Sequence, residues 1–392
     1  MKPQEPRVPI AVLSLAAPAV PAELRAAAAC AADDDVASGG LRLVTCQRVE
    51  VYTSERHADT LVAEPPWTVA RRRDGISAAH HAIGVALGLE SGVLGEDQVL
   101  HQLRAAVTDA RRRSALSEPL ATLFELALRA GRTGRSWRPS RPRSLADVAV
   151  ARLATLADGS LPGRTVLVVG AGEMGRLAAL AAAAAGARVV VMSPTAANAL
   201  DVAAAAGGTA TSFDAWPAGV SVDAVVVALS GRWHLTRTSA EALLGVPNVI
   251  DLSMPSALPD EVVRRLGHAH LDLDGLIAGT IERDEKANRI EQRYLDRLEE
   301  LRELTVTAYL DRLAERASAD VAAALAGRIE RDRATELEAL WQRLPQLAEH
   351  DRAAIDEMSR HLAKRLFRVP LSRIAQDPSG RRGRVAQELF EL

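Results

Sequence analysis

The sequence predicts a multidomain α/β protein with a doubly wound parallel sheet in its middle part. The chain has 392 residues, which is too long for a single ordinary hydrophobic core. Strand-like and helix-like segments alternate through residues 165–252, the pattern of parallel strands connected by helices. From about Ile281 to Phe367 the sequence is charged and helical in pattern, with few breakers. Together these observations predict three consecutive domains.

The composition is that of a folded globular protein, with 48% hydrophobic and 25% charged residues. The two cysteines, Cys30 and Cys46, are too few for a disulfide framework or a cysteine-rich metal site, so no metal is expected. We find neither a signal-peptide pattern nor an apolar run long enough for a bilayer, which predicts a cytoplasmic protein with no membrane partner. Arginine clusters such as 71–73 and 111–113 allow an RNA partner, but most clusters of this kind are solvated surfaces, and that interpretation is the stronger one.

The first block is predicted to be an α+β domain. Strand patterns cover Val8–Ser14, Leu41–Thr45 and Val49–Thr53, and helical patterns cover Pro21–Ala32, Ser77–Leu89, Asp97–Arg113 and Leu120–Ala130. A proline- and arginine-rich stretch, Ser136–Arg143, then interrupts the periodicity. We therefore place the end of the first domain at residue 143.

The second block carries the alternation typical of a parallel sheet. Strands are predicted at Thr165–Val169, Arg188–Met192, Ala224–Leu229 and Val249–Leu252, and helices at Met174–Ala185 and Ala196–Ala206. The first strand leads directly into a glycine turn, whose residues are Gly170, Ala171, Gly172, Glu173, Met174 and Gly175. In such a turn the glycines permit a tight bend, a close approach of a pyrophosphate and close packing of helix on strand. The block is therefore predicted to bind a nicotinamide dinucleotide.

The end of the second strand leaves the choice of dinucleotide open. Ser193, Pro194 and Thr195 follow the strand, where an acidic residue would bind the ribose of NAD. Neither an acid nor an arginine stands there, so NADP is not repelled and its usual guanidinium contact is absent. The hydroxyls of Ser193 and Thr195 are the candidate ligands.

A second set of candidate functional residues, of types that can take part in catalysis, lies in the first block. Cys46 falls between two predicted strands, Arg48 follows it, and His81 lies in a predicted helix. A cysteine near a strand end is most often a small buried apolar residue. A cysteine nucleophile, however, needs a nearby cation to stabilise its thiolate and a proton donor for the leaving group. Arg48 and His81 are side chains of those types, so the combination predicts a thiol active site.

At these residues the chain resembles the glutamyl-tRNA reductase family. Thr45–Tyr52 matches the family's Thr-Cys-Asn-Arg-x-Glu-x-Tyr segment, with Gln47 in place of the asparagine. His81 and Gly88–Gln98 match a family histidine followed by Gly-Leu-Asp-Ser-x-Val-Leu-Gly-Glu-x-Gln, with Glu90 in place of the aspartate. The turn Gly170–Gly175 is identical to the turn that is common in the family. Further matches are Phe124–Gly131, Ser144–Ala154, Val249–Asp251 with Pro255, and Lys364–Phe367.

The resemblance implies an architecture and a reaction. It implies a catalytic domain at residues 1–143, a Rossmann-type NADP(H) domain at 144–280, and a spinal helix with a helical dimerisation domain at 281–392, in a V-shaped homodimer. The implied reaction is the NADPH-dependent reduction of glutamyl-tRNA to glutamate-1-semialdehyde, the first step of the five-carbon route to tetrapyrroles such as porphyrins. A downstream aminotransferase is a further expected partner.

The resemblance also implies roles for individual residues. Cys46 would attack the glutamyl ester to form a thioester, and His81 would protonate the departing ribose oxygen. Arg48 would pair with the carboxylate of the glutamate side chain. The remaining residues of the implied substrate pocket are Thr45, Glu50, Ser91, Glu96 and Gln98. The cofactor would bind at Gly170–Gly175 with Ser193 and Thr195.

Several residues depart from the family pattern. Ser14, Leu15 and Ala16 replace a His-Lys-Thr segment, Ser193-Pro194 replaces Asn-Arg, Val49 replaces a threonine, and Ser256 replaces an arginine. Two alternatives therefore stay open. One is a paralogue that reduces another aminoacyl-tRNA, its pocket reshaped by Leu15, Ala16 and Val49. The other is a catalytically weak homologue that binds tRNA or a partner protein.

Overall fold

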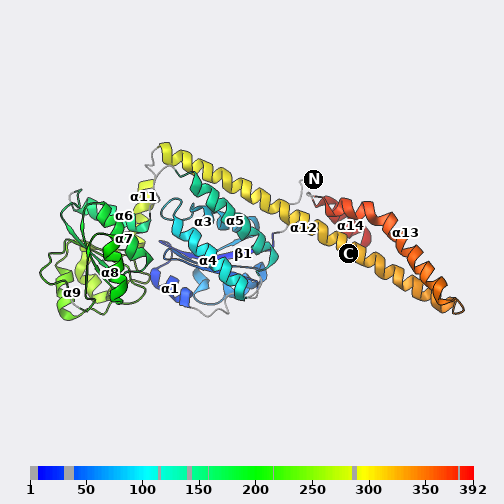
Figure 1. Cartoon of the computed structure of the whole chain (residues 1–392), viewed down its shortest axis with the longest axis horizontal. Helices are drawn as coiled ribbons and strands as arrows, with labels where there is room; N and C mark the ends of the chain where they lie inside the picture. The colour runs from blue at the N-terminus through cyan, green and yellow to red at the C-terminus, as the bar shows by residue number, and fades with distance from the viewer. Residues whose placement is uncertain are drawn as a thin grey trace. The chain divides into compact units, whose positions relative to one another are not determined.

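The computed structural model describes residues 8–30, 39–113, 116–138, 144–157, 159–214, 216–284, 289–377 and 380–392 (Figure 1). The chain divides into two compact units. Residues 9–303 form one of them and contain both β-sheets, and Leu304–Leu392 form the main part of the other. None of the helices in the described part of the chain is both long and apolar enough to cross a bilayer.

The N-terminal part of the first unit is built on a four-stranded antiparallel sheet with the order β2-β3-β1-β4. Its strands are β1 (Ala11–Ala16), β2 (Leu41–Val44), β3 (Arg48–Thr53) and β4 (Arg71–Asp74). The associated helices are α1 (Ala22–Cys30), α2 (Glu55–Leu61), α3 (Gly75–Leu87), α4 (Asp97–Arg113) and α5 (Glu118–Ser136), with a 3-10 turn, η2, at Trp67–Val69. This is the α+β domain that the sequence predicts.

The two faces of this sheet have opposite characters, because successive side chains of a strand point to opposite sides. One face carries Leu13, Leu15, Val49 and Val51, which form an apolar core with Trp67. The paired positions Ser14↔Glu50 and Ala16↔Arg48 belong to the other face. There Tyr52 meets Phe124 of α5 edge to face, with ring centroids 5.0 Å apart. Polar side chains of β1 and β3 are therefore enclosed between the sheet and helices.

This alternation corrects one expectation from the sequence. Leu15 and Val49 were candidates for reshaping the substrate pocket, but both belong to the apolar core on the opposite face from Arg48 and Glu50. Leu15 and Val49 are directly paired across β1 and β3, and both are fully buried. Of the three replacements considered, Ala16 alone shares the face of Arg48. Changes at Leu15 and Val49 therefore act on packing rather than on the pocket.

The second sheet is parallel and has six strands in the order β10-β9-β8-β5-β6-β7. The strands are β5 (Thr165–Val169), β6 (Arg188–Met192), β7 (Thr209–Thr211), β8 (Ala224–Val227), β9 (Val249–Asp251) and β10 (His270–Asp272). Apolar clusters line both of its faces, as a sheet covered by helices on both sides requires. The predicted doubly wound sheet is thus confirmed.

The helices of this second sheet outnumber the two that the sequence pattern placed, at Met174–Ala185 and Ala196–Ala206. They are α6 (Leu145–Leu156), α7 (Glu173–Ala184), α8 (Ala196–Ala205), α9 (Arg237–Leu244), α10 (Asp260–Leu266) and α11 (Leu273–Asp284), with a 3-10 turn, η3, at Gly267–Ala269. Helix α6 begins at a reciprocal capping box, in which Ser144 and Asp147 each bond the other's backbone N–H. This cap fixes where the chain enters the second sheet after the predicted boundary, of which Pro139–Arg143 lie outside the described residues.

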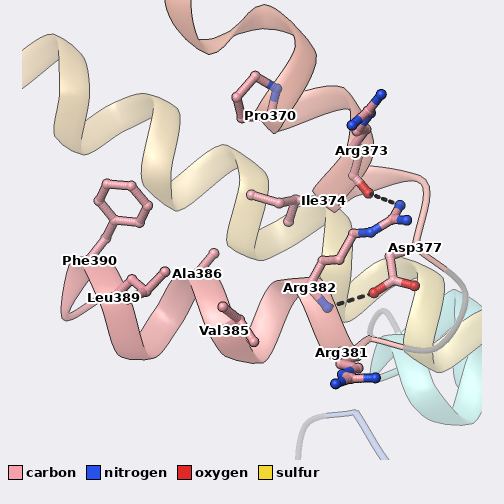
Figure 2. Close-up of a pocket in the computed structure, with 10 residues that line it drawn as sticks. All are labelled: Pro370, Arg373, Ile374, Asp377, Arg381, Arg382, Val385, Ala386, Leu389 and Phe390. Atoms are coloured by element: carbon pink, nitrogen blue, oxygen red, sulfur yellow. Dashed lines mark hydrogen bonds between the residues drawn. The ribbon is translucent and has the colours of Figure 1, made fainter.

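The predicted C-terminal helical region is also confirmed. It contains α12 (Arg289–Arg343), α13 (Glu349–Ala375) and α14 (Arg381–Phe390). The break between α12 and α13 was not predicted, and it falls at Pro345, which cannot continue a helix. In the C-terminal unit, α13 and α14 line a pocket of about 540 Å³ (Figure 2). Apolar side chains of α14 face it beside Arg382, whose backbone N–H donates to Asp377 at 2.7 Å.

Candidate active site

Cys46 lies at the tip of the tight hairpin that joins β2 to β3. The backbone N–H of Thr45 donates to the carbonyl of Arg48 at 2.9 Å, which closes the turn around Cys46 and Gln47. The Thr45 hydroxyl accepts from the N–H groups of Gln47 and Arg48 at 3.1 and 3.0 Å. Thr45 is therefore a residue that shapes the turn, through a side-chain contact that competes with the strand ladder. These hydrogen bonds fix the backbone on both sides of Cys46.

The surroundings of Cys46 disfavour its thiolate in the absence of other molecules. The side chain is partly buried and packs against the apolar cluster of the parallel sheet. Burial and the nearby Glu96 carboxylate raise the pKa of the thiol to about 12, against the smaller effects of Arg25 and Arg48. A thiol with such a pKa is a weak nucleophile. Chemistry at Cys46 therefore needs a group that accepts its proton.

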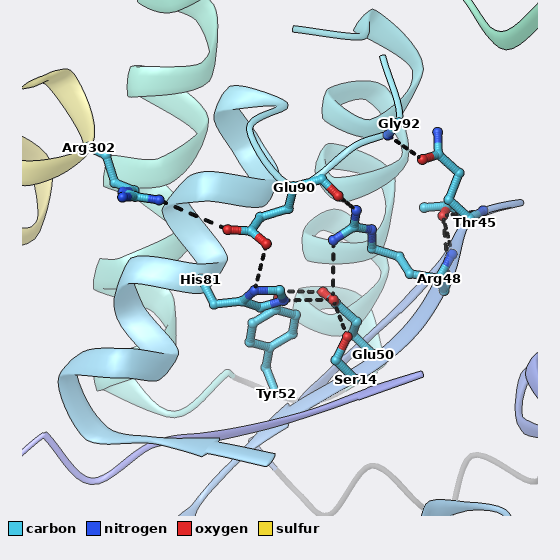
Figure 3. Close-up of polar contacts among 10 residues, drawn as sticks. Ser14, Thr45, Arg48, Glu50, Tyr52, His81, Glu90, Gly92 and Arg302 are labelled. Carbon is cyan, nitrogen blue, oxygen red and sulfur yellow. Dashed lines mark hydrogen bonds and ion pairs between the residues drawn. The ribbon is translucent and has the colours of Figure 1, made fainter. Parts of the chain in front are cut away.

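Behind the hairpin, Arg48, Glu50 and His81 form a buried polar network (Figure 3). The Glu50 carboxylate lies 2.7 Å from Nε2 of His81 and 3.5 Å from a guanidinium nitrogen of Arg48. Arg48 also donates to the backbone carbonyl of Glu90. Glu50 accepts two further hydrogen bonds, from Ser14 at 2.8 Å and Tyr52 at 2.6 Å. A buried carboxylate with so many donors is held in its charged form.

His81 lies between two carboxylates. Its Nε2 faces Glu50, and its Nδ1 is 3.6 Å from the Glu90 carboxylate, which is itself 4.0 Å from Arg302 of α12 (Figure 3). Although burial favours the neutral ring, the two carboxylates raise the pKa of His81 above its ordinary value of 6.5. The two carboxylates therefore favour the imidazolium more than the surroundings of an ordinary histidine do. Among the described residues, Cys46 and His81 share no hydrogen bond.

The loop after α3 brings Glu90, Ser91 and Gly92 to this network. Helix α3 ends at Gly88, whose φ of +78° is left-handed, and a Cβ there would lie 2.7 Å from the Cα of Gly95. A side chain at Gly88 would open this contact, and one at Gly95 would meet the Tyr294 hydroxyl at 2.7 Å, so the closed loop requires glycine at both positions. Its closure presents Glu90 to His81. Ser14, Tyr52, Glu90 and Arg302 are network members that were not expected to take part.

A second polar cluster adjoins the hairpin on the Gln47 side. The Gln47 amide donates to the Glu96 carboxylate at 2.7 Å and accepts from the backbone N–H of Gly92 at 2.8 Å. Burial raises the pKa of Glu96 to about 7, although Gln47, the Leu145 backbone, Arg48 and Arg135 favour its charged form. Gln47 thus connects the hairpin to Glu96 through its side-chain amide. Gln98 lies buried in the first turn of α4, two residues beyond Glu96.

Several side chains around Cys46 carry a buried polar atom with no hydrogen-bond partner among the described residues. Three of these atoms are Arg48 Nε, the Ser91 hydroxyl and Glu96 Oε1, and Arg25 Nε and His81 Nδ1 are two others. A buried polar atom without a partner costs about 1–3 kcal/mol, so each is an unusual feature of a folded protein. A bound molecule with a carboxylate and hydroxyl or amine groups would satisfy all three. These atoms mark a candidate substrate pocket beside the thiol.

The glycine turn has the shape of a dinucleotide cradle. A Cβ at Gly170 would lie 2.1 Å from the carbonyl oxygen of Ala228, and one at Gly175 would lie 2.0 Å from that of Gly170. These two positions therefore admit glycine alone, whereas Gly172 faces open space. Helix α7 begins at Glu173, so its free N–H groups point toward that space. Ala171 and Met174 lie beside these glycines and pack on the cluster below the sheet.

The candidate ribose ligands lie at the end of β6. Ser193 is buried, while Pro194 and Thr195 are exposed. Thr195 precedes α8 as its N-terminal cap residue, and its side chain makes no capping hydrogen bond. Its hydroxyl and the first N–H groups of α8 are therefore accessible to a ligand. The residues present fit a dinucleotide, although no arginine follows β6.

Comparison with known proteins supports the reading of each part of the chain. Residues 7–137 match the model of the glutamyl-tRNAGlu reductase N-terminal domain, and residues 297–392 match that of the glutamyl-tRNAGlu reductase dimerisation domain. Residues 152–278 match the shikimate/quinate 5-dehydrogenase model. The three matches follow the three blocks of the sequence.

Relatives that match larger parts of the chain carry the same name. A glutamyl-tRNA reductase of Kineococcus radiotolerans is 35% identical over 60% of this chain, which spans 58% of that relative. The structure of glutamyl-tRNA reductase from Methanopyrus kandleri has 27% identity and a TM-score of 0.52, covering 98% of this chain and 99% of that one. A glutamyl-tRNA reductase of Methanocella arvoryzae is 30% identical over 89% of this chain and 85% of its own length. The chain therefore belongs to the glutamyl-tRNA reductase family.

Proposed function

We propose that this protein reduces glutamyl-tRNA to glutamate-1-semialdehyde through a thioester on Cys46. The observation that carries the proposal is the group of buried, unpartnered polar atoms on Arg48, Ser91 and Glu96 around the hairpin of Cys46. Arg48 already donates to Glu50 and to the Glu90 carbonyl, which leaves its Nε for a further acceptor. A carboxylate at that nitrogen is the natural partner of a guanidinium. Glutamate offers such a carboxylate on its side chain.

The roles of the remaining residues follow from their contacts. Thr45 fixes the turn, and Glu50 holds both Arg48 and His81 in place. The carboxylates beside His81 raise its pKa, and its imidazolium would protonate the ribose oxygen as the ester bond breaks. Because both ring nitrogens face carboxylates, delivery of that proton requires the ring to exchange one of these contacts. Gln98 would contribute to the wall of the pocket from the start of α4.

The parallel-sheet domain would hold NADPH. Gly170–Gly175 would surround the pyrophosphate at the N-terminus of α7, and Ser193 and Thr195 would contact the ribose. NADPH would supply the hydride that reduces the thioester. A contact between an arginine guanidinium and the 2′-phosphate typically contributes about 1.5–3 kcal/mol to binding. Since no arginine follows β6, we expect the preference for NADP over NAD to be roughly 10- to 100-fold weaker than in a protein that has this contact. Titration of both cofactors tests this.

We also propose that the C-terminal unit forms a homodimer. One stripe of α13 exposes Met358, Leu362, Leu366 and Val369, each at least 49% accessible. These residues recur at the spacing of one helix face, and a stripe of this kind is typical of a surface covered by another helix. The match to the family's dimerisation domain points to a second copy of this chain. Replacement of Leu362 and Leu366 by glutamate should give monomers in light scattering.

The experiment that tests the reaction uses the purified protein, NADPH and a panel of charged tRNAs. We expect the aldehyde product from glutamyl-tRNA and a covalent glutamyl adduct on Cys46 when the cofactor is left out. Turnover of a different aminoacyl-tRNA, without glutamyl-tRNA, would show that the pocket serves another amino acid. An absence of turnover with every charged tRNA, with dinucleotide still bound, would leave a tRNA- or partner-binding role. An interaction with a downstream aminotransferase would be tested by measuring whether that enzyme changes the rate at which the aldehyde product is released.

A further inference from the structure

The side chain of Glu90 lies against helix α3 and reaches His81. Its Oε2 is 3.6 Å from Nδ1 of His81, and its other oxygen, Oε1, is 4.0 Å from Arg302 of α12 (Figure 3). Gly84, one turn after His81, leaves room for this side chain, because a Cβ there would lie 3.0 Å from Oε1 and 3.2 Å from Cγ of Glu90. The backbone carbonyl of Glu90 accepts a hydrogen bond from Arg48. One residue thus contacts both the proposed acid and the guanidinium proposed to bind the substrate.

The two contacts of the His81 ring differ in strength. Nε2 lies 2.7 Å from Glu50, a fully buried carboxylate that also accepts hydrogen bonds from Tyr52 and Ser14. Nδ1 has no hydrogen-bond partner among the described residues, and the Glu90 oxygen at 3.6 Å is beyond hydrogen-bond length. The Glu90 side chain is also 30% exposed, whereas that of Glu50 has no exposure. The contact with Glu90 is therefore the one that the ring can exchange at the smaller cost.

We propose that Glu90 is a positioning residue that holds the His81 ring at Nδ1 and yields that nitrogen to the ribose oxygen of the substrate. This inference rests on the proposed function, because the ribose oxygen belongs to the glutamyl ester. Arg302 would keep the displaced carboxylate, since it already lies beside Oε1 of Glu90. Glu90 thus acts through His81 and needs no contact of its own with the reacting atoms.

The proton transfer balances with water as the other participant. The Nδ1–H bond of the imidazolium breaks, and its proton goes to the ribose oxygen as the ester C–O bond breaks and the sulfur of Cys46 bonds to the carbonyl carbon. The ring becomes neutral and keeps its Nε2 proton in the hydrogen bond to Glu50. Water takes the proton of the thiol and returns one to Nδ1, so His81 and Glu90 regain their starting forms.

The charged groups around His81 decide how firmly this proton is held. Burial favours the neutral ring, but the Glu50 and Glu90 carboxylates outweigh it and raise the pKa of His81, against a smaller effect of Arg73. The titratable and charged groups that face the ring or its two carboxylates come from β3, β4, the loop after α3 and α12, and they are Arg48, Glu50, Tyr52, Arg73, Glu90 and Arg302. Removal of the Glu90 charge should therefore lower the pKa of His81 and leave the bond to Glu50 in place.

Nitrogen NMR of the protein with isotope-labelled histidine tests the proposal without tRNA or NADPH. His81→Asn identifies the signals of His81 among those of the nine histidines. As the pH rises we expect Nδ1 to lose its proton while Nε2 keeps its own, and we expect the pKa of His81 to be lower by about 1 in Glu90→Gln. Glu90→Asp keeps the charge but shortens the side chain, so its pKa should fall by less. Glu300→Gln, which removes an exposed carboxylate of α12, is the control and should leave the pKa unchanged.

A second variant leaves every charge in place. Gly84→Ala puts a Cβ where the Glu90 side chain lies and favours helix α3, so it should move the carboxylate away from Nδ1 without unfolding the domain. Should Glu90→Gln fail to fold, Gly84→Ala decides by the same measurement. Loss of the proton from Nε2 instead of Nδ1, or a pKa within about 0.2 of wild type in the deciding variant, would overturn the proposal.

Kinetics with charged tRNA separate this inference from the proposed function. Glu90→Gln should lower kcat roughly 10-fold with KM nearly unchanged, and its activity should be lost at a lower pH on the alkaline side, in step with the pKa of His81. An unchanged kcat in an active enzyme would overturn the positioning role. The expected NMR result with no turnover of any charged tRNA would count against the proposed function, and the hold of Glu90 on His81 would still be supported.

Discussion

Replacement of Glu50 by glutamine should destabilise the N-terminal domain in a manner that depends on pH. Glu50 is fully buried and receives donors from His81 at 2.7 Å, Tyr52 at 2.6 Å and Ser14 at 2.8 Å, with Arg48 at 3.5 Å. Glutamine keeps the size but removes the charge that faces two buried cations. Loss of one partner of a buried ion pair typically costs about 3–5 kcal/mol. For a domain of this size, that loss lowers the midpoint of thermal unfolding by roughly 10–20 °C.

The pH dependence follows from the two pKa shifts. The pKa of Glu50 lies well below its ordinary value of 4.5, so its contribution is present above about pH 4.5 and is lost as the pH falls through its folded value. The pKa of His81 lies above 6.5, so its contribution is present below about pH 6.5 and is lost as the pH rises through its folded value. The difference between wild type and Glu50→Gln should therefore be largest between pH 4.5 and 6.5 and smaller at pH 8.5.

Thermal unfolding followed at pH 5.5 and pH 8.5 provides the assay. Tyr52→Phe is the matched control, because it removes one hydrogen bond to Glu50 and leaves the charges of Glu50 and His81 in place. It should lower the midpoint with much less dependence on pH. A midpoint for Glu50→Gln within about 2 °C of wild type at pH 5.5 would refute the charged network, since the cost would then be under about 1 kcal/mol.

Three further predictions concern activity and binding. Cys46→Ser should abolish reduction of the charged tRNA while Cys30→Ser, an exposed position, keeps it, and the reverse result would exclude the thioester. Arg48→Lys should impair turnover strongly, with KM raised, because lysine lacks the forked geometry; unchanged kinetics would remove Arg48 from the carboxylate contact. Gly175→Ala should weaken dinucleotide binding at least about tenfold, because its Cβ would lie 2.0 Å from a backbone oxygen. The Cβ of Gly172→Ala meets no protein atom within 4 Å, so this variant tests only how closely the pyrophosphate approaches the backbone. Fluorescence titration compares the two variants, and equal effects would contradict the proposed dinucleotide site.

The parts of the fold with strong apolar periodicity could be predicted closely from the sequence. Helix Asp97–Arg113 and strands Thr165–Val169 and Arg188–Met192 have the bounds that their patterns indicate. Strand β1 runs from Ala11 to Ala16 rather than from Val8 to Ser14, because pairing with β3 rather than hydrophobicity decides its ends. Predicted residues 31 and 32 of the first helix lie outside the described residues. Strand ends are set by partners that a sequence pattern does not show.

The composition of the site was less accessible to sequence reasoning. Arg48 and Glu50 are two residues apart on one strand, so their shared face follows from alternation. The link from Gln47 to Glu96 crosses 49 positions, and no local pattern encodes it. The glycine that follows α3 indicates that Glu90 lies in a loop directly after the helix. Its contact with His81, however, depends on how that loop closes. Long-range polar contacts of this kind require the tertiary structure.

The arginine cluster at 71–73 has a consequence for how the protein avoids aggregation. These arginines belong to β4, the strand at one edge of the antiparallel sheet, and β1 is its one partner there. Its outer edge offers unpaired backbone groups to any extended chain that approaches. Arginine side chains on both faces of the strand, with Arg72 held by Asp59 and Asp74, surround that edge with charge and hinder a second strand from docking. Because of these charged residues β4 has no apolar pattern, and it was not predicted from the sequence. The same charges disfavour the addition of a strand from a second molecule to this edge of the sheet.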